Sequence, residues 1–262
     1  MYFVLFCCCW CSVFSRYFDI MDACLQSQPV WLNMQELYDL QYFYVDPVNI
    51  GHCTSGIAFE TMMSIYWEHR PIQFCGQEWY SAVRQSSENP LVQGFLAKHI
   101  CLSHIVSNGL GIVSPSLGQM SHAPFTIKPN WDHQLSSGHP VCLYVPTAYN
   151  FKAVDAIILH VDYNTKKVNM YLIQITLSIW HKPSDKDFYG EMWERWVESL
   201  ENAGFTVEST FVWIDKKQPA GHTGPQLVKK LWSGTKTIHP EYCSVHVGIG
   251  QVDPRLAIVL NL

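Results

Sequence analysis

Three polar residues near the middle of the chain have the types and spacing of a metal-dependent phosphodiesterase site. Asp155 stands between Val154 and Ala156 in an apolar stretch, and Gln174 and Thr176 lie two residues apart in a later one. An acidic residue in an apolar strand is costly unless it has a partner or a metal. Cleavage of a phosphodiester needs acidic oxygens around hard cations and a group that stabilises charge near the attacking water. Because residues two apart in a strand share a face, the pattern predicts such a site on a β-hairpin.

Three further residues complete this hypothesis. Glu60 lies beside an apolar stripe in a helix predicted from about residue 54 to 70, and it is expected to supply a third oxygen to the cation. His181 and Lys182 follow the strand that carries Gln174, and either is a candidate cationic group. The expected metal ligands are therefore Glu60, Asp155 and Gln174.

Each of these residues also has an ordinary structural interpretation. Glu60 suits a solvent-facing helix position, and Asp155 suits a turn cap or a pair with a lysine. Gln174 suits a buried amide that bridges strands, and Thr176 is a common strand residue. His181 suits a hydrogen bond to a backbone carbonyl. Both interpretations stay open at the level of the sequence, since motif matches are hypotheses.

The elements that must position these residues follow from periodicity and turn chemistry. Asn89-Pro90 predicts a helix start and Asn108-Gly109 its end, while Asp162–Thr165 predicts the turn of a hairpin. The predicted helices are 54–70, 89–108, 188–203 and 225–233; the predicted strands are 71–74, 141–145, 154–161, 168–176, 205–214, 244–249 and 256–261; residues 110–140 are expected to form a loop. This order predicts an α/β domain with a mixed central sheet and a β-meander flanked by helices.

Four segments in this order resemble a known family. They are Ser55–Glu60, Tyr144–Ile158, Leu172–Ser178 followed by His181, and the strand ending near Trp213. Together they resemble the C-terminal domain of Crinkler and retrotransposon-hot-spot (RHS) proteins, which is similar to the PD-(D/E)xK nucleases. The resemblance covers about residues 50–216, and it implies a restriction-endonuclease-like core and an intracellular, potentially nuclear, effector or transposon-derived protein.

The resemblance also assigns roles residue by residue. It places Glu60 at the helix carboxylate and Asp155 at the central metal-binding aspartate, and it implies Mg²⁺ as cofactor and DNA as partner. Gln174 and Thr176 fall where the family has an acid and a lysine. Glutamine brings a carbonyl oxygen without charge, and threonine cannot replace a lysine that stabilises the developing phosphate charge. Two functions therefore remain: metal-dependent DNA hydrolysis with an atypical motif, or a catalytically inactive DNA-binding or host-interaction module.

Composition and missing motifs argue against several other classes of protein. The 262 residues are 48% hydrophobic and 15% charged, which favours a packed core, and the formal net charge is −5, which argues against a generally basic DNA-coating protein. The sequence has no HExxH, GxSxG or P-loop motif, so zincin, α/β-hydrolase and P-loop ATPase chemistry have no support, and no small-molecule cofactor is expected. Local basic surface is expected from lysines in the second half: Lys166, Lys167, Lys182, Lys186, Lys216, Lys217, Lys229 and Lys230.

The N-terminal segment is unusual in composition. Four of the 10 cysteines lie between Cys7 and Cys11 in an apolar run of about 14 residues, shorter than the ~20 that span a bilayer. This run is interpreted as a buried strand or a gene-model artefact, with a signal anchor as the alternative, and no membrane association is expected. Residues 1–50 are interpreted as a lead-in and residues 51–262 as one domain; a gene fragment without a stable fold is the remaining alternative.

Overall fold

The computed structural model describes most of the second half of the chain and short parts of the first. The described residues are 43–45, 51–53, 76–88, 90–147, 151–178, 184–216, 226–228, 232–233, 236–237 and 242–262. The chain divides into two compact units, residues 1–96 and 97–262. The predicted helix 54–70 and strand 71–74 lie outside the described residues, and the predicted domain boundary at residue 50 stays a prediction.

The described part of the first unit is small. Strand β1 (Phe43–Val45) pairs antiparallel with β2 (Gly51–Cys53), and helix α3 (Gln77–Gln85) is followed by a short 3₁₀ turn, η2 (Ser86–Glu88). The side chains of Trp79, Tyr80 and Val83 on α3 are buried. Helix α3 was not predicted.

Helix α4 (Pro90–Asn108) begins at the predicted proline and ends at the predicted Asn108-Gly109, and the unit boundary falls within it; the predicted cap Asn89 lies outside the described residues. Proline begins the helix because its missing N–H is one that no helical carbonyl would accept there. Gly109 ends it with φ of +82°, and its N–H donates to the carbonyl of Ile105 at 2.8 Å. Glycine adopts this left-handed conformation without the steric cost of a Cβ.

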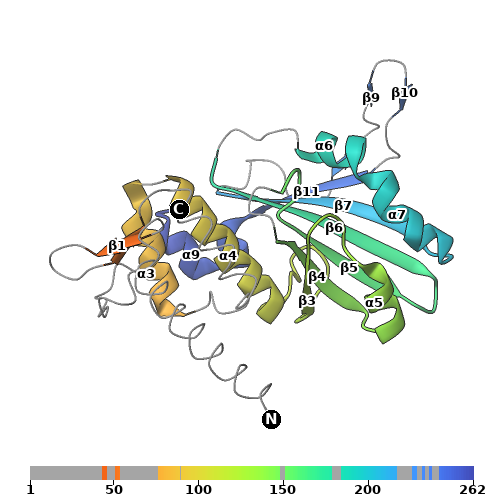
Figure 1. Ribbon diagram of the computed structural model, residues 1–262, viewed down its shortest axis with the longest axis horizontal. Helices are drawn as coiled ribbons and strands as arrows, with labels where there is room; N and C mark the ends of the chain where they lie inside the picture. The colour runs from red at the N-terminus through yellow and green to blue at the C-terminus, as the bar shows by residue number, and fades with distance from the viewer. Residues whose placement is uncertain are drawn as a thin grey trace, which may run out of the picture. The chain divides into compact units, whose positions relative to one another are not determined.

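The second unit is built on a mixed sheet (Figure 1). Among the described residues it has seven strands in the order β3-β4-β5-β6-β7-β11-β8. The meander β4-β5-β6 is antiparallel, whereas β3 runs parallel to β4, and β6, β7 and β11 run parallel to one another. The strand bounds are β3 Ser121–Phe125, β4 Val141–Pro146, β5 Ala156–Asp162, β6 Lys167–Thr176, β7 Thr206–Asp215, β8 Gln226–Val228 and β11 Tyr242–Gly248. The predicted α/β class, with a mixed sheet, a meander and flanking helices, is confirmed.

Helices α6 (Ser184–Glu191) and α7 (Trp193–Asn202) cover one face of this sheet (Figure 1). Phe188 of α6 and Trp196 and Leu200 of α7 pack in one buried cluster with Leu172 of β6 and Phe211 of β7. The opposite face is also apolar and buried; it includes Leu143, Ala156, Ile158, Ile173, Val212 and Ile214. Strands covered on both faces read as nearly continuous apolar runs, which explains the composition of residues 156–161 and 170–175.

Several predicted elements are wrong in detail. The segment 110–140 was predicted as a loop, but it contains strand β3 and helix α5 (Trp131–Ser137). Helix α5 is short and depends on local caps: Asn130 Oδ1 accepts from the N–H of Asp132 at 3.2 Å, and Gly138 ends it with φ of +71°. The predicted helix 188–203 is two helices, separated at Met192.

The C-terminal elements also differ from prediction. Where a helix was predicted at 225–233, the described residues form strand β8 and part of a small hairpin of β9 (Trp232–Ser233) and β10 (Lys236–Thr237). Where a strand was predicted at 256–261, α9 (Pro254–Val259) is a helix that follows the single turn α8 (Ile249–Val252). The apolar run of α9 fits either period, and Asp253-Pro254 decides it in favour of a helix start.

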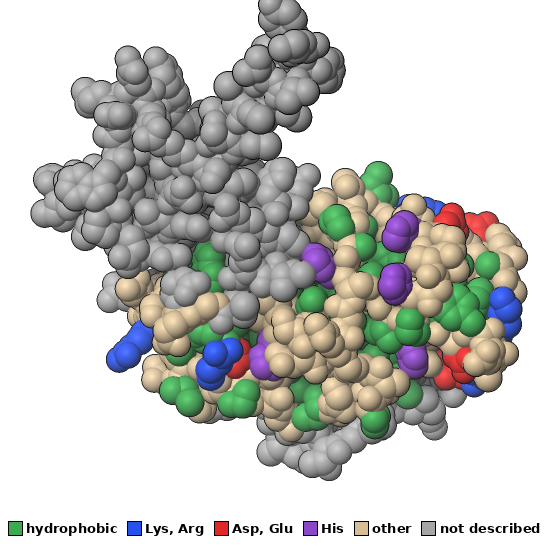
Figure 2. Space-filling model, turned by 90° about the horizontal axis from the view of Figure 1, so that it is seen from below, with side chains coloured by type: hydrophobic (Ala, Val, Ile, Leu, Met, Phe, Trp, Pro, Cys, Tyr) green, Lys and Arg blue, Asp and Glu red, His purple; other side chains and the backbone are tan. Residues whose placement is uncertain are grey.

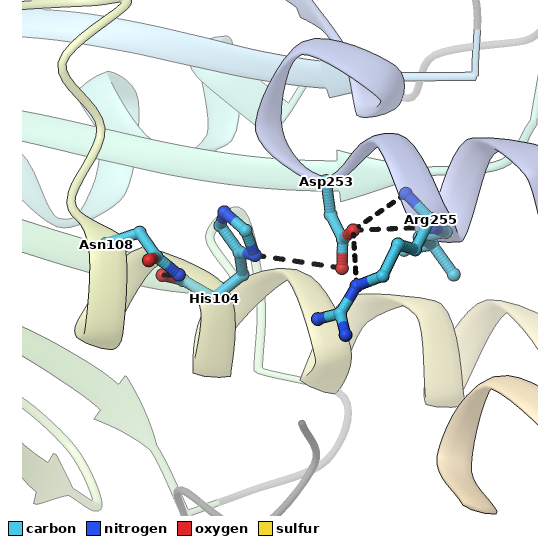
Figure 3. Close-up of polar contacts among 5 residues, drawn as sticks. His104, Asn108, Asp253 and Arg255 are labelled. Atoms are coloured by element: carbon cyan, nitrogen blue, oxygen red, sulfur yellow. Dashed lines mark hydrogen bonds and ion pairs between the residues drawn. The ribbon is translucent and has the colours of Figure 1, made fainter. Parts of the chain in front are cut away.

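Asp253 connects α9 to α4 (Figure 3). Its buried carboxylate caps α9 by accepting from the N–H groups of Arg255 and Leu256 at 3.0 and 3.4 Å. Its other oxygen lies 3.8 Å from Nδ1 of His104 on α4. The cap therefore also fixes the second half of α4 against the C-terminal helices. None of the helices in the described ranges is long and apolar enough to cross a membrane.

Candidate active site

Asp155 lies directly before β5, opposite β6. The backbone N–H of Asp155 donates to the carbonyl of Ile173 at 2.8 Å. Oδ2 of Asp155 accepts two hydrogen bonds of 2.7 Å, from Nε2 of Gln174 and from the N–H of Ile175. The register of the hairpin, in which Ala156 pairs with Ile173, produces this contact. The predicted proximity of Asp155 and Gln174 is therefore found, with the glutamine amide as a donor to the carboxylate.

Lys98 of α4 contacts the same carboxylate. Its Nζ lies 3.3 Å from Oδ1 of Asp155, and only 15% of the lysine side chain and 12% of the aspartate side chain are exposed. A lysine in the apolar helix 90–108 is unusual, and this is the sequence signal that could have identified it. Asp155 thus has a lysine partner, as one of its structural interpretations allowed.

Thr176 ends β6 and makes a local contact. Its hydroxyl oxygen accepts from the N–H of Ser178 at 3.0 Å, a turn interaction that terminates the strand. Thr176 shares a sheet face with Gln174, as predicted from their spacing. Glu60, His181 and Lys182 lie outside the described residues, so their predicted roles stay predictions.

A second acid–base pair lies on the neighbouring strands. Oδ2 of Asp215, at the end of β7, is 2.7 Å from Nδ1 of His246 on β11, and the two side chains are 5% and 21% exposed. The imidazole stacks on the indole of Trp213 with an interplanar angle of 11°. A carboxylate on one ring nitrogen fixes the orientation of a histidine. Sequence reasoning missed this pair because its members are 31 residues apart.

The strand register brings both groups to one edge of the sheet. Gln174 pairs with Trp213, and Trp213 pairs with His246, so these three residues form one row across β6, β7 and β11. Thr176 and Asp215 form the next row. Since neighbouring strands are about 4.8 Å apart, His246 lies about 10 Å from Gln174 along the sheet. The carboxyl ends of parallel strands are the usual place for a site in such a sheet.

Burial and nearby charges shift the pKa of two side chains on α4. Burial, together with the carboxylates of Asp253 and Asp155, raises the pKa of the Cys101 thiol far above its ordinary value. Burial and the neighbouring charge of Lys98 lower the pKa of His99 well below its ordinary value of 6.5. Cys101 therefore remains a thiol and His99 a neutral imidazole at physiological pH.

The donor chemistry allows a metal only in part. Within the residues that the structure describes, no three His, Cys, Asp or Glu side chains gather as a metal cluster. Asp155 offers a carboxylate, and the amide oxygen of Gln174 is a neutral donor. Mg²⁺ is commonly held by one or two carboxylates, water and substrate phosphate, so these two residues match part of such a ligand set.

Comparison of the chain with protein-family models, with curated proteins and with solved structures finds no match.

Proposed function

We propose that this domain hydrolyses phosphodiester bonds in DNA, with a restriction-endonuclease-like core and an intracellular place of action. The observation that carries the proposal is the contact of Lys98 with Asp155 beside Gln174. This reaction needs a carboxylate, a further oxygen ligand and a positively charged group, and a mostly buried lysine supplies the last of these. The resemblance of the sequence to Crinkler and RHS domains supports the same function.

Lys98 takes the part that Thr176 cannot. Negative charge develops on the phosphate oxygens as water attacks, and a fixed ammonium nearby lowers the barrier. Lys98 is held in place by Asp155 at 3.3 Å and is mostly buried, so little reorganisation is needed when charge develops. Asp155 in turn has its orientation fixed by the two donors on Oδ2.

Mg²⁺ would be held by Glu60, Asp155 and the Gln174 carbonyl oxygen, and when bound it would polarise the phosphate and activate water. In the structure the amide nitrogen of Gln174 donates to Asp155, and the amide oxygen is the atom that would face the cation. The remaining contribution of the chain is the positioned ammonium of Lys98.

A second function is favoured by a different aspect of the same contacts. Both carboxylate oxygens of Asp155 already have protein donors, an arrangement that equally describes a structural ion pair. On this interpretation the domain is a catalytically inactive DNA-binding or host-interaction module. Figure 2 shows no continuous basic surface on the described part of that face, where the Lys and Arg side chains are scattered.

Cleavage of labelled single- and double-stranded DNA with Mg²⁺ or Mn²⁺ separates the two functions. The wild type is compared with Asp155→Ala and with Asp132→Ala, a matched control at an exposed aspartate in the first turn of α5. Hydrolysis predicts metal-dependent cutting that Asp155→Ala loses and Asp132→Ala keeps. DNA binding by folded protein without cutting would contradict hydrolysis and support the inactive module.

A further inference from the structure

A groove opens between the segment after β3 and the start of α7. Its volume is about 550 Å³, and its lining includes Ile127, Lys128, Phe151, Arg195, Trp196 and Glu198. A volume of this size suits a small organic ligand or one unit of a polymer. Neither proposed function above uses these residues.

The groove carries two cations. Lys128 and Arg195 are both exposed, and Glu198 is the single acidic residue of the lining, in a protein whose formal net charge is −5. The Arg195 guanidinium donates from its terminal nitrogen Nη2 to the carbonyl of Glu191 at 3.1 Å, which uses one of its five N–H donors. Two basic residues against one acidic residue give the lining a net charge of +1, and a positive groove on an acidic protein favours an anionic ligand.

The rest of the lining is aromatic and apolar. Phe151 is half-buried and packs edge-on against Phe125 at 5.1 Å between ring centroids, and it lies 6.0 Å from Trp196. The backbone of Trp196 is held by Trp131, whose Nε1 donates to the carbonyl of Trp196 at 2.8 Å. Ile127 stands at the rim with 77% of its surface exposed. A rigid ring beside cations is the combination with which proteins bind an unpaired base and its phosphate.

The groove lies on the same edge of the sheet as Asp155. Phe125 at the end of β3 pairs with Pro146 at the end of β4, and Tyr144 pairs with Ile157. Continuing the antiparallel register by two residues brings Pro146 opposite Asp155. Phe151 precedes Asp155 by four residues, a span of about 14 Å at most. A polymer held in the groove can therefore reach Asp155 within two or three nucleotides.

We propose that this groove binds one unstacked nucleotide of single-stranded DNA, with its phosphate between Lys128 and Arg195 and its base against Phe151 and Ile127. The inference rests on the proposed function in that it names the substrate as single-stranded DNA held beside Asp155. Paired bases stack within a duplex and cannot enter a groove of this size without being extruded. Single strands are therefore bound in preference to duplex.

Binding without cleavage tests the groove apart from the chemistry. A fluorescein-labelled deoxythymidine strand of about 12 nucleotides, within the usual site sizes of such proteins, is titrated with full-length protein in EDTA, and its anisotropy is measured against salt. The double substitution Lys128→Gln/Arg195→Gln is expected to weaken binding about 10-fold or more and to reduce the salt slope by about 0.7, the value for one phosphate contact on a single strand. Phe151→Leu is expected to weaken it about 5-fold or more.

The matched control is Arg84→Gln/Arg255→Gln, which removes the same charge from two exposed side chains that do not line the groove. It is expected to stay within about twofold of the wild type, and the duplex of the same length is expected to bind about 10-fold more weakly. Equal loss in both double variants, or a preference for duplex, would overturn the groove. If binding depends on the groove residues but no metal-dependent cutting is seen, the groove inference stands and hydrolysis is rejected. If cutting is seen but binding does not depend on the groove residues, hydrolysis stands and the groove inference is rejected.

Discussion

The ion pair between Lys98 and Asp155 should be a measurable part of the stability. Both side chains are mostly buried, so removal of one partner leaves the other charge poorly solvated. A double-mutant cycle with Lys98→Met and Asp155→Asn should give a coupling energy of about 1–3 kcal/mol. Urea unfolding of the four proteins measures it. Additive effects would show that the two groups do not interact in solution.

Gln174→Glu restores the acid that the resemblance implies and so tests for a cation. Without metal, the new carboxylate replaces a donor to Asp155 and repels it, which should cost about 1–3 kcal/mol. Millimolar Mg²⁺ should recover much of this loss, because a cation stabilises the folded state in proportion to its binding. Thermal unfolding with and without Mg²⁺ measures the recovery, with Gln134→Glu, a buried amide far along the chain, as control. An equal response of both variants to Mg²⁺ would argue against a site at Gln174.

The candidate site could be predicted only where it is local in sequence. The hairpin turn at Asp162–Thr165 sets the register that places Asp155 against Gln174, so their contact follows from the sequence. Lys98 lies 57 residues before Asp155 in the sequence, and only the packing of α4 brings them together. The Asp215–His246 pair depends on the parallel crossover between β7 and β11, which no turn signal specifies.

Among the connecting elements, the end of α4 makes a sharp prediction about one glycine. Gly109 has φ of +82°, and a Cβ there would stand 2.1 Å from the carbonyl oxygen of Leu117, which accepts from the N–H of Leu110. Gly138 also has positive φ, +71°, but open space where its Cβ would be. Gly138→Ala should cost about 1–2 kcal/mol from backbone strain alone, and Gly109→Ala about 1–3 kcal/mol more from the clash. Urea unfolding compares them, and equal losses would contradict the close approach.

Long elements with continuous patterns were predicted well, and short ones were not. Pro90 and Gly109 define α4, and the strands of the meander have long apolar runs. Helix α5 has only seven residues, and β3 contains Pro124, which sequence rules assign to a loop. An edge position explains the proline, because β3 is the outermost strand of the described sheet. Short elements of this kind depend on tertiary packing more than on propensity.

For the molecule as a whole, buried histidine predicts how stability depends on pH. Burial and Lys98 depress the pKa of His99 in the folded state, whereas the unfolded chain titrates near 6.5. Below pH 6.5 the unfolded state binds a proton that the folded state does not, so stability is present above this pH and is lost as pH falls. The loss is up to about 1.4 kcal/mol per pH unit. His122, whose pKa is also lowered by burial, acts in the same direction.

Urea unfolding at about pH 7.5, 6.5 and 5.5 measures this dependence in the wild type and in His99→Gln. The variant should lose much of the slope below pH 6.5, because it has no proton to take up on unfolding. An unchanged slope in the variant would assign the pH dependence to other groups and contradict the inferred protonation of His99.

The most direct test of the account is the rate of DNA cleavage by Lys98→Met. Without Lys98 the described part of the site has no positively charged side chain in place of the lysine that the nuclease motif carries. Removing one charge-stabilising donor typically costs about 100–1,000-fold in rate. Cleavage with Mg²⁺ is compared in the wild type, Lys98→Met and Lys98→Arg, each first shown to unfold cooperatively. The account predicts a loss of about 100-fold or more for Lys98→Met with partial activity in Lys98→Arg. Cutting by Lys98→Met at the wild-type rate would contradict it.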